Sequence, residues 1–211
     1  MLKINEIYAS IQGESSHTGL PCVFIRLTGC NLRCSWCDTA YAFYDGKNLT
    51  VEETLQKVET FGLPLVEITG GEPLLQEDVY PLMEALLKKG YRVMLETSGA
   101  LPIDKVPEKV IKILDIKCPG SGEEKKNHLE NLKFLSPHDE VKFVLLDRAD
   151  YEWSRNLLQK HNLSTTQVLF SPVYDKLNLK DLSQWILKDR LAVRLQTQLH
   201  KVIWSKDAIG V

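Results

Sequence analysis

Short β-branched runs alternate with helical patterns along most of this chain, and this alternation restricts the possible fold more than any other feature. Apolar, β-branched runs that are bounded by turn residues predict strands. They lie at Val23–Thr28, Leu65–Thr69, Arg92–Glu96, Lys112–Ile116, Val141–Leu145, Gln167–Phe170 and Ala192–Leu195. Strands that alternate with helices imply an α/β fold in which a parallel sheet is built with right-handed crossovers.

The segments between these runs carry helix signals. Thr50 followed by Glu53 forms a capping box, which opens a helix over Val51–Thr60. Apolar residues at helical spacing predict a second helix over Val79–Leu87, and Gly90 is its stop signal. Further helices are expected at Tyr151–Lys160 and Leu179–Lys188.

The length of the chain limits how far such a sheet can curl. With 211 residues, the chain is shorter than the about 250 residues typical of a closed eight-unit barrel. We therefore expect an incomplete, partial TIM-like barrel of mostly parallel strands, in a single domain that spans residues 1–211. Sheets of this kind bind ligands at the carboxyl ends of their strands.

Small, polar and metal-binding residues follow the predicted strands. Three cysteines come after the first strand, and Gly70-Gly71-Glu72-Pro73 comes after the second. Later strands lead into Thr97-Ser98-Gly99, Lys117, Ser171-Pro172 and the stretch from Gln196 to Lys201. Because the carboxyl ends of parallel strands share one edge of the sheet, the sequence predicts a functional site at that edge.

Composition excludes several classes of function. Apolar residues make up 44% of the chain and charged residues 26%, which is the balance of an ordinary globular protein. The net charge of −2 provides no positive field that would attract nucleic acid or an acidic membrane. No apolar run is long enough to span a bilayer, and the stretch from Met1 to Glu6 does not resemble a signal peptide. We expect a cytoplasmic protein that binds neither nucleic acid nor membrane.

The placement of the cysteines is the least ordinary feature of the composition. Three of the five, Cys30, Cys34 and Cys37, fall within eight residues, and the other two read as small buried hydrophobes. Thiolates suit zinc, Cu(I) and iron–sulfur clusters. A structural zinc site needs four ligands, so Cys22 or His17 would have to complete it. A 4Fe–4S cube held by three cysteines keeps one iron open to a further ligand, which fits three thiols on one short loop.

The spacing Cys-x3-Cys-x2-Cys resembles that of the radical S-adenosylmethionine (SAM) superfamily. The resemblance implies a 4Fe–4S cluster held by Cys30, Cys34 and Cys37, whose open iron chelates SAM. An electron from the cluster then breaks a C–S bond of SAM and yields a 5′-deoxyadenosyl radical. The resemblance also implies that Trp36 lies near the adenine and that the glycine-rich stretch starting at Gly70 binds the methionine amino group, since glycine lets backbone groups approach a ligand closely.

Further motifs narrow the resemblance. They are Ile11-Gln12-Gly13-Glu14, the run from Phe24 to Leu32, Cys37-Asp38-Thr39, Thr69 to Pro73, Glu96 to Gly99, and Gln198 to Lys201. Together they resemble the 7-carboxy-7-deazaguanine synthase family over nearly the whole chain. That resemblance implies a carbon–nitrogen lyase of queuosine and deazapurine biosynthesis. Its reaction contracts the ring of 6-carboxy-5,6,7,8-tetrahydropterin to 7-carboxy-7-deazaguanine, with loss of ammonia and with SAM as a regenerated cofactor.

The same resemblance implies roles for individual residues, with no catalytic side chain beyond the cluster and SAM. The implied substrate contacts are Ile11, Gln12, Gly13, Glu14, Arg26, Thr69 and His200. The implied SAM contacts are Trp36, Cys37, Asp38, Gly71, Glu72, Thr97, Ser98, Asp115, Ile116, Lys117, Ser171, Pro172, Val173 and Tyr174. Thr39 matches the protein ligand of a Mg²⁺ ion, whose octahedron waters and a substrate carboxylate can complete.

Several of these residues have an ordinary reading when they are taken alone. Gln12-Gly13-Glu14 is typical of a solvated turn, and Thr39 of a turn. Arg26 would be a surface charge and His200 a structural histidine. Lys142 is interpreted only as a strand residue.

The resemblance also predicts partners. They are a small-molecule pterin substrate, flavodoxin or ferredoxin as the electron donor, and a second copy of the chain in a homodimer. A glycyl-radical-enzyme activating protein, which shares the cysteine loop, is the alternative enzyme, and a zinc-stabilised binding module is the alternative without catalysis.

Gly120–Lys126 reads as a surface loop. Ten residues follow Lys201, so the sequence argues against a role for the Val211 carboxylate in the site.

Overall fold

A curved sheet organises the molecule, whose computed structural model describes residues 1–161, 163 and 168–211. The strand order in the described part of the chain is β3-β1-β2-β4-β5-β6-β7-β8-β9. Every neighbouring pair from β2 to β9 is parallel, whereas β1 runs antiparallel to both β2 and β3. The strands are β1 (Leu2–Ile11), β2 (Pro21–Leu27), β3 (Lys47–Leu49), β4 (Leu65–Gly70), β5 (Arg92–Thr97), β6 (Ile111–Asp115), β7 (Glu140–Leu145), β8 (Val168–Pro172) and β9 (Arg194–Leu195).

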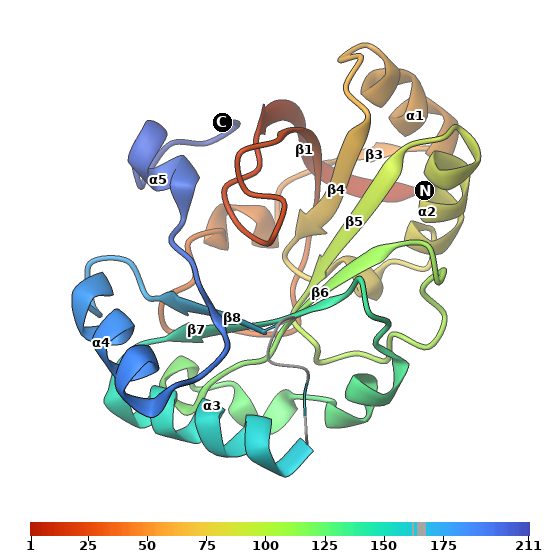
Figure 1. Ribbon diagram of the computed structural model, residues 1–211. Helices are drawn as coiled ribbons and strands as arrows, with labels where there is room; N and C mark the ends of the chain where they lie inside the picture. The colour runs from red at the N-terminus through yellow and green to blue at the C-terminus, as the bar shows by residue number, and fades with distance from the viewer. Residues whose placement is uncertain (162, 164–167) are drawn as a thin grey trace.

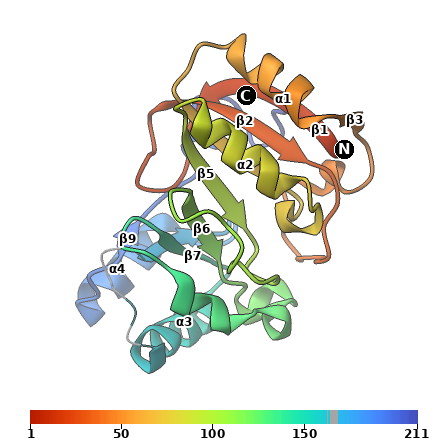
Figure 2. The ribbon, with the colours of Figure 1, turned by 90° about the vertical axis from the view of Figure 1, so that its right-hand side faces the viewer.

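The sheet does not close on itself, because β3 and β9 form its two edges. Figures 1 and 2 show the sheet curving from β1 through β5 and β6 to β8, with α1, α2 and α3 along its outer side. The helices are α1 (Val51–Glu59), α2 (Val79–Lys88), α3 (Arg148–His161), α4 (Leu179–Asp189) and the short α5 (Leu199–Ile203). The prediction of an incomplete α/β barrel with mostly parallel strands is confirmed.

Local sequence accounts well for the helix boundaries. The predicted capping box is present, since Thr50 Oγ1 accepts from Glu53 N at 3.1 Å and Glu53 Oε2 accepts from Thr50 N at 2.7 Å. The helix predicted at Tyr151–Lys160 begins earlier, at Arg148, where Asp150 N donates to Asp147 Oδ1 at 3.1 Å. Because this first turn is polar, the apolar spacing that predicts a helix begins only after the helix has started.

The alternation of side chains along each strand decides which residues can form a site. On β2, Val23, Ile25 and Leu27 pack into the core between the sheet and the helices. Phe24 belongs to a smaller cluster on the inner side of the sheet, together with Cys22, Leu65, Met94 and Ile113. Because side chains alternate between the two faces with a period of two, polar residues in register with the second set point inward. Arg26 and Thr69 are in that register.

The sequence prediction missed two strands and one α-helix and made another strand too long. β1, β3 and α5 were not expected, and β9 covers only Arg194–Leu195 of the predicted Ala192–Leu195. The strand predicted at Gln167–Phe170 is β8, although Gln167 itself lies outside the described residues. β1 is an edge-region strand with polar residues at many positions, so its apolar pattern is weak.

The segment read as a surface loop, Gly120–Lys126, is folded and partly buried. It contains two single-turn 3-10 helices, Pro119–Ser121 and Glu124–Lys126. Ser121 is 1% exposed and Glu123 is 8% exposed. The prediction of a surface loop holds for Gly122, Lys125 and Lys126, which are exposed. It fails for Ser121 and Glu123, because the segment packs against the cysteine loop, a contact that its glycine-rich and charged composition does not reveal.

Candidate active site

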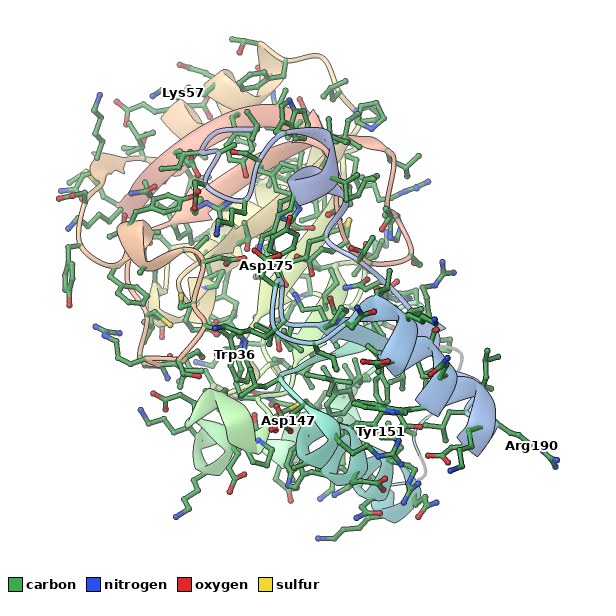
Figure 3. All side chains as sticks on the ribbon, turned by 90° about the vertical axis from the view of Figure 1, so that its left-hand side faces the viewer. Trp36, Lys57, Asp147, Tyr151, Asp175 and Arg190 are labelled. Atoms are coloured by element: carbon green, nitrogen blue, oxygen red, sulfur yellow. The ribbon has the colours of Figure 1, made fainter. Side chains whose placement is uncertain are left out.

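A cavity of about 840 Å³ lies on the inner side of the sheet. Its wall joins the loops after β2, β4, β5, β6 and β8 to the segment after β9. Trp36 and Asp175 both line it, and Figure 3 shows both on the same side of the molecule, whereas Arg190 projects from the periphery. The predicted site residues in its lining are Ile11, Gln12, Gly13, Glu14, Arg26, Cys30, Cys34, Trp36, Cys37, Asp38, Thr39, Thr69, Gly71, Thr97, Ser98, Asp115, Lys117, Val173, Tyr174 and His200.

Four predicted SAM contacts lie outside this lining, namely Glu72, Ile116, Ser171 and Pro172. Ile116 and Ser171 are buried, at 2% and 1% exposure. Their roles stay predictions. Neighbouring residues of the same segments, such as Asp115 and Val173, do reach the cavity.

The three cysteines lie on the loop that follows β2, and each is partly exposed. Leu32 N–H points at Cys30 Sγ at 3.4 Å, and Cys37 N donates to Cys34 O at 3.2 Å. Burial raises the pKa of the Cys30 and Cys34 thiols. Among the described residues, no three His, Cys, Asp or Glu side chains are gathered as ligands of a single metal ion. A 4Fe–4S cube fits three spread thiols, because each thiolate binds a different iron.

The glycine-rich stretch after β4 packs directly against the cysteine loop. A Cβ atom at Gly71 would lie 2.1 Å from Gly29 O and 2.8 Å from Cys30 Cβ, so only glycine fits there. Glu72 N donates to Gly29 O at 2.8 Å and fixes the same approach. The backbone at Gly71 therefore forms one wall of the cavity beside the first cysteine, where it suits a ligand held close to the main chain.

The Glu72 carboxylate ties the end of β4 to the end of β5. It is fully buried and accepts hydrogen bonds from Leu74 N at 3.0 Å, Thr97 Oγ1 at 2.9 Å and Ser98 N at 2.8 Å. Buried carboxylates are stable when their oxygens are satisfied in this way. The side chain of Glu72 thus supports the loops that border the cavity.

Lys142 on β7 is the centre of the polar wall, so the interpretation of it as only a strand residue is wrong. Its ammonium group lies 2.9 Å from Glu14 Oε2 and 3.5 Å from Asp115 Oδ2, and it also pairs with Glu96. The Lys142 side chain is 5% exposed. Burial opposes its charge, but Glu14 and Glu96 raise the pKa of Lys142 above its ordinary value.

Glu14 is held as an anion by this environment. Burial alone would raise its pKa, but Lys142, Gln198 and His200 lower it below the ordinary value. Gln198 Nε2 donates to Glu14 Oε1 at 3.0 Å. Since Lys142 holds the other oxygen, Oε2, the carboxylate has a fixed position in the cavity wall.

The loop from Gln12 to Leu20 follows β1 and lies on the inner side of the curved sheet, as Figure 1 shows. Leu199 N donates to Gly13 O at 2.9 Å, which connects the end of β1 to α5. A Cβ atom at Gly13 would lie 2.2 Å from His200 Nδ1, so this loop and the histidine are in close contact. Because β1 is antiparallel to β2, Ile11 at its end pairs with Pro21 at the start of β2, so this loop approaches the site from the edge opposite the carboxyl ends of the parallel strands.

Gln12 and Glu67 form a buried pair behind this loop. Gln12 Nε2 donates to Glu67 Oε2, and Gln12 Oε1 accepts from Glu14 N at 3.0 Å. Burial and the neighbouring Glu96 raise the pKa of Glu67 well above its ordinary value, which favours the protonated acid. Sequence reasoning missed Glu67, although its position two residues before Thr69 on the same strand places both on one face.

Arg26 points inward as its strand register requires, and it has partners of its own. Arg26 Nε donates to Glu6 Oε1 at 2.7 Å, and Arg26 Nη2 donates to Tyr8 Oη at 2.8 Å. Tyr41 Oη donates to the same Glu6 oxygen at 2.8 Å. Sequence reasoning missed Glu6, Tyr8 and Tyr41. Glu6 and Tyr8 are two positions apart, which places them on one face of a strand. This signal could not be used, because β1 was not predicted as a strand.

The predicted SAM segment after β6 carries an unsatisfied acceptor. Asp115 Oδ2 pairs with Lys117 Nζ at 2.9 Å, whereas Asp115 Oδ1 is buried with no hydrogen-bond partner in the described part of the chain. Although burial opposes it, Asp115 and Cys34 raise the pKa of Lys117. A buried acceptor next to a charged lysine suits a polar cofactor whose groups donate to the acceptor.

The far rim of the cavity is made by the end of the described chain. Lys201 Nζ lies 2.7 Å from Asp38 Oδ2, and this lysine lowers the pKa of Asp38 against the effect of burial. Residues 206–211 line the cavity as well. The argument against a role for the Val211 carboxylate is not supported, because the chain folds back after α5 and Val211 itself lines the cavity. Thr39 Oγ1 lies 3.8 Å from Cys37 Sγ, and its role toward Mg²⁺ stays a prediction.

A partial barrel with three cysteines after its first parallel strand and a glycine-rich loop after the next defines a radical SAM protein. The model of the Radical SAM superfamily matches residues 24–118. Curated 7-carboxy-7-deazaguanine synthases match over the full chain. The protein from Koribacter versatilis is 48% identical, with all of both chains covered, and that from Chlorobaculum tepidum is 45% identical, with all of this chain and 97% of the relative covered. The chain belongs to the 7-carboxy-7-deazaguanine synthase family.

Solved structures agree on the fold. The crystal structure of QueE from Escherichia coli superposes with a TM-score of 0.78 at 24% identity and covers 94% of each chain. Streptococcus suis SuiB bound to S-adenosylmethionine gives a TM-score of 0.56 at 13% identity, over 81% of this chain and 45% of that one. In the described part of the chain, none of the helices has the length and apolar character needed to cross a membrane.

Proposed function

We propose that this chain contracts the ring of 6-carboxy-5,6,7,8-tetrahydropterin to 7-carboxy-7-deazaguanine with loss of ammonia. The observation that carries the proposal is one cavity that joins the cysteine loop to a polar wall built on Lys142 and Glu14. A relative that is 48% identical over the full length and bears the synthase name supports the specific reaction. No observation favours the glycyl-radical-enzyme activating protein, which would act on a polypeptide.

Cys30, Cys34 and Cys37 would hold a 4Fe–4S cluster, which when bound supplies the electron that cleaves SAM to a 5′-deoxyadenosyl radical. The residues around it bind and orient the cofactor. The backbone at Gly71, which its close approach to Gly29 places beside Cys30 in the cavity wall, would accept the methionine end. Asp115 offers its unpaired Oδ1 to a donor of the cofactor.

The polar wall would bind the hydrogen-bonding edge of the pterin. That edge presents N–H donors beside a carbonyl, so it needs a charged acceptor and a donor at fixed spacing. Glu14 supplies the acceptor, because Lys142 lowers its pKa and keeps it ionised. His200 has a pKa lowered by burial, so at neutral pH it offers a neutral ring. Thr69 and the backbone of Gln12 would complete the contacts.

Arg26 would bind the substrate carboxylate. Its guanidinium lies at the cavity wall with Glu6 and Tyr8 on one side, which leaves its remaining N–H groups for an anion. Thr39 would hold a Mg²⁺ ion against the same carboxylate. A hydroxyl beside the third cysteine suits a hard cation that keeps several waters.

The proposal extends to partners of the enzyme. A low-potential carrier, flavodoxin or ferredoxin, would deliver the electron, and a second copy of the chain would form a homodimer. Both follow from the family and not from contacts within this chain.

Turnover by the anaerobically reconstituted full chain tests the proposed reaction. With SAM, Mg²⁺ and a chemical reductant, the chain should convert the carboxylated tetrahydropterin to the deazaguanine acid and release one ammonia per turnover. Turnover of the wild type and of Thr39→Ala with and without Mg²⁺ tests the role of Thr39. Turnover by the wild type should depend on Mg²⁺, and turnover by the variant should not. Cleavage of SAM without any deazapurine product would refute the ring contraction while leaving the radical SAM assignment intact.

A further inference from the structure

The segment from Cys118 to Lys126 contacts the cysteine loop at residues 31–35, whereas the glycine-rich stretch contacts it at residues 29 and 30. It follows β6 and is green at the bottom of Figure 1, and in Figure 3 it lies next to the loop that carries Trp36. Its contacts with the cysteine loop are hydrogen bonds to the residues that lie between the cysteines. We call residues 118–126 the outer clamp.

Three positions of the cysteine loop are bonded to the outer clamp. Arg33 N donates to Glu123 Oε1 at 2.6 Å. Ser35 donates twice, from N to Ser121 O at 3.1 Å and from Oγ to Gly120 O at 2.9 Å. Lys126 Nζ donates to Asn31 O at 3.3 Å. Asn31 and Arg33 lie between Cys30 and Cys34, and Ser35 lies between Cys34 and Cys37, so these bonds hold the backbone between the three cysteines.

The outer clamp is anchored in the core of the protein. Asp150 on α3, which is 1% exposed, accepts from Gly120 N at 2.8 Å and from Leu146 N at 2.9 Å. A Cβ atom at Gly120 would lie 2.7 Å from Asp150 Oδ2, so the close approach needs glycine. Gly122 has a φ of +77°, which turns the chain so that Glu123 faces the cysteine loop. The clamp is therefore built on a rigid support.

Glu123 is the strongest point of contact. Its carboxylate pairs with Lys126 at 2.9 Å, and Lys126 and the Arg33 N–H together lower the pKa of Glu123. It thus accepts from the Arg33 backbone as an anion at neutral pH, and such a charge-assisted bond is stronger than one between neutral groups. Without this partner, the partly buried amide of Arg33 would lose its acceptor.

We propose that the outer clamp holds the cysteine loop in its cluster-binding shape before the cluster is present, with Glu123 as the positioning residue. The inference rests on the assignment of a 4Fe–4S cluster to the three cysteines. A loop with three ligands that is ordered in advance loses less conformational entropy when it binds the cluster. Weakening the clamp should therefore loosen the cluster more than it destabilises the fold.

Cluster retention by the full chain tests the inference. The wild type, Glu123→Ala and Glu123→Gln are reconstituted anaerobically, and iron per chain and the decay of the cluster's visible absorption in excess iron chelator are measured. Glu124→Ala is the matched control, because it removes the same charge from the next position. Thr50→Ala is the control for general destabilisation, because it weakens α1 far from the loop. Thermal unfolding of the metal-free chains gives the stability of each variant.

We expect the Glu123→Ala variant to release its cluster at least about tenfold faster than the wild type. A factor of about ten in rate corresponds to the free energy of one lost charge-assisted hydrogen bond. Glu123→Gln should fall between them, since its amide oxygen can still accept from Arg33 N. Glu124→Ala and Thr50→Ala should retain the cluster like the wild type. Equal release by Glu123→Ala and the wild type, or equally fast release by Thr50→Ala, would overturn the clamp. A wild-type chain that takes up no iron would instead overturn the cluster assignment itself.

Discussion

Replacement of Lys142 by methionine tests the electrostatic account of the cavity wall. Methionine keeps the length and most of the apolar volume of the lysine stem but removes the charge. In the wild type, the ammonium lies within 2.9 Å of Glu14 and 3.5 Å of Asp115 and also pairs with Glu96. The variant leaves these three carboxylates around an uncharged side chain.

The expected loss of stability follows from the exposure of the groups. Removal of one partner from a buried ion pair costs about 3–5 kcal/mol, whereas an exposed pair contributes less than about 1 kcal/mol. Lys142 is 5% exposed, but Glu14 and Glu96 are 18% and 26% exposed and keep some hydration. We therefore expect a loss near the lower end, about 3 kcal/mol, which a domain with a typical stability of about 5–15 kcal/mol survives.

The pH dependence of this loss gives a sharper test. In the wild type the pKa of Glu14 is lowered, so its stabilisation is present above the unfolded value of about 4.3 and is lost as the pH falls through the still lower folded value. The pKa of Lys142 is raised, so its contribution is present below about 10.4 and is lost only at higher pH. Neither group titrates between about pH 5 and pH 8.

In the variant, the burial of Glu14 is no longer offset by Lys142, so its folded pKa rises above the unfolded value. The native state then binds more protons than the unfolded state, and stability falls as the pH rises, by up to about 1.4 kcal/mol per pH unit for one proton. The difference in stability between wild type and variant should therefore shrink as the pH is lowered from 8 to 5.

Denaturant unfolding of the metal-free, reduced chain measures this difference, because the midpoint and slope give the free energy of unfolding at each pH. Lys109→Met is the matched control, since Lys109 is exposed and the same change should alter stability by less than about 0.5 kcal/mol. A deficit below about 1 kcal/mol for Lys142→Met, or one that does not vary with pH, would refute the reasoning.

Three other substitutions probe the cluster, the loop contact and the fold. Cys34→Ala should abolish both the visible absorption of the reconstituted cluster and SAM cleavage, and retained cleavage would contradict its role as a ligand. Gly71→Ala should displace the cysteine loop, because its Cβ would lie 2.1 Å from Gly29 O, and iron content after reconstitution should fall; full iron loading would show that the loop can yield. Thr50→Ala should remove about 1 kcal/mol of stability through the lost cap and leave the specific activity unchanged, as measured by unfolding and turnover.

The elements that the sequence predicted well are those with local causes. The capping box at Thr50 joins residues three positions apart. The cysteine loop carries its three ligands within eight residues. Strands β2, β4, β5 and β7 were found from their own apolar pattern, and the glycine-rich stretch was placed correctly after β4.

The residues that sequence reasoning missed acquire their roles from distant partners. Lys142 and Glu14 are separated by 128 positions, and nothing near Lys142 in the chain distinguishes it from a strand residue with one solvated face. Glu67 and Gln12 are 55 positions apart. From the sequence, most of the outer clamp is interpreted as a surface loop, because the partner of Glu123 is Arg33, which is 90 positions away.

Short-range patterns of strand, turn and cysteine were enough to predict the class of fold and the chemistry of the cluster loop. The polar wall of the cavity and the support of the cysteine loop could be recognised only in the folded chain, because a buried charge is stable only beside a partner of opposite sign or a hydrogen-bond donor. Which partner lies nearby depends on the curvature of the sheet and on the antiparallel β1, and both are properties of the assembled chain.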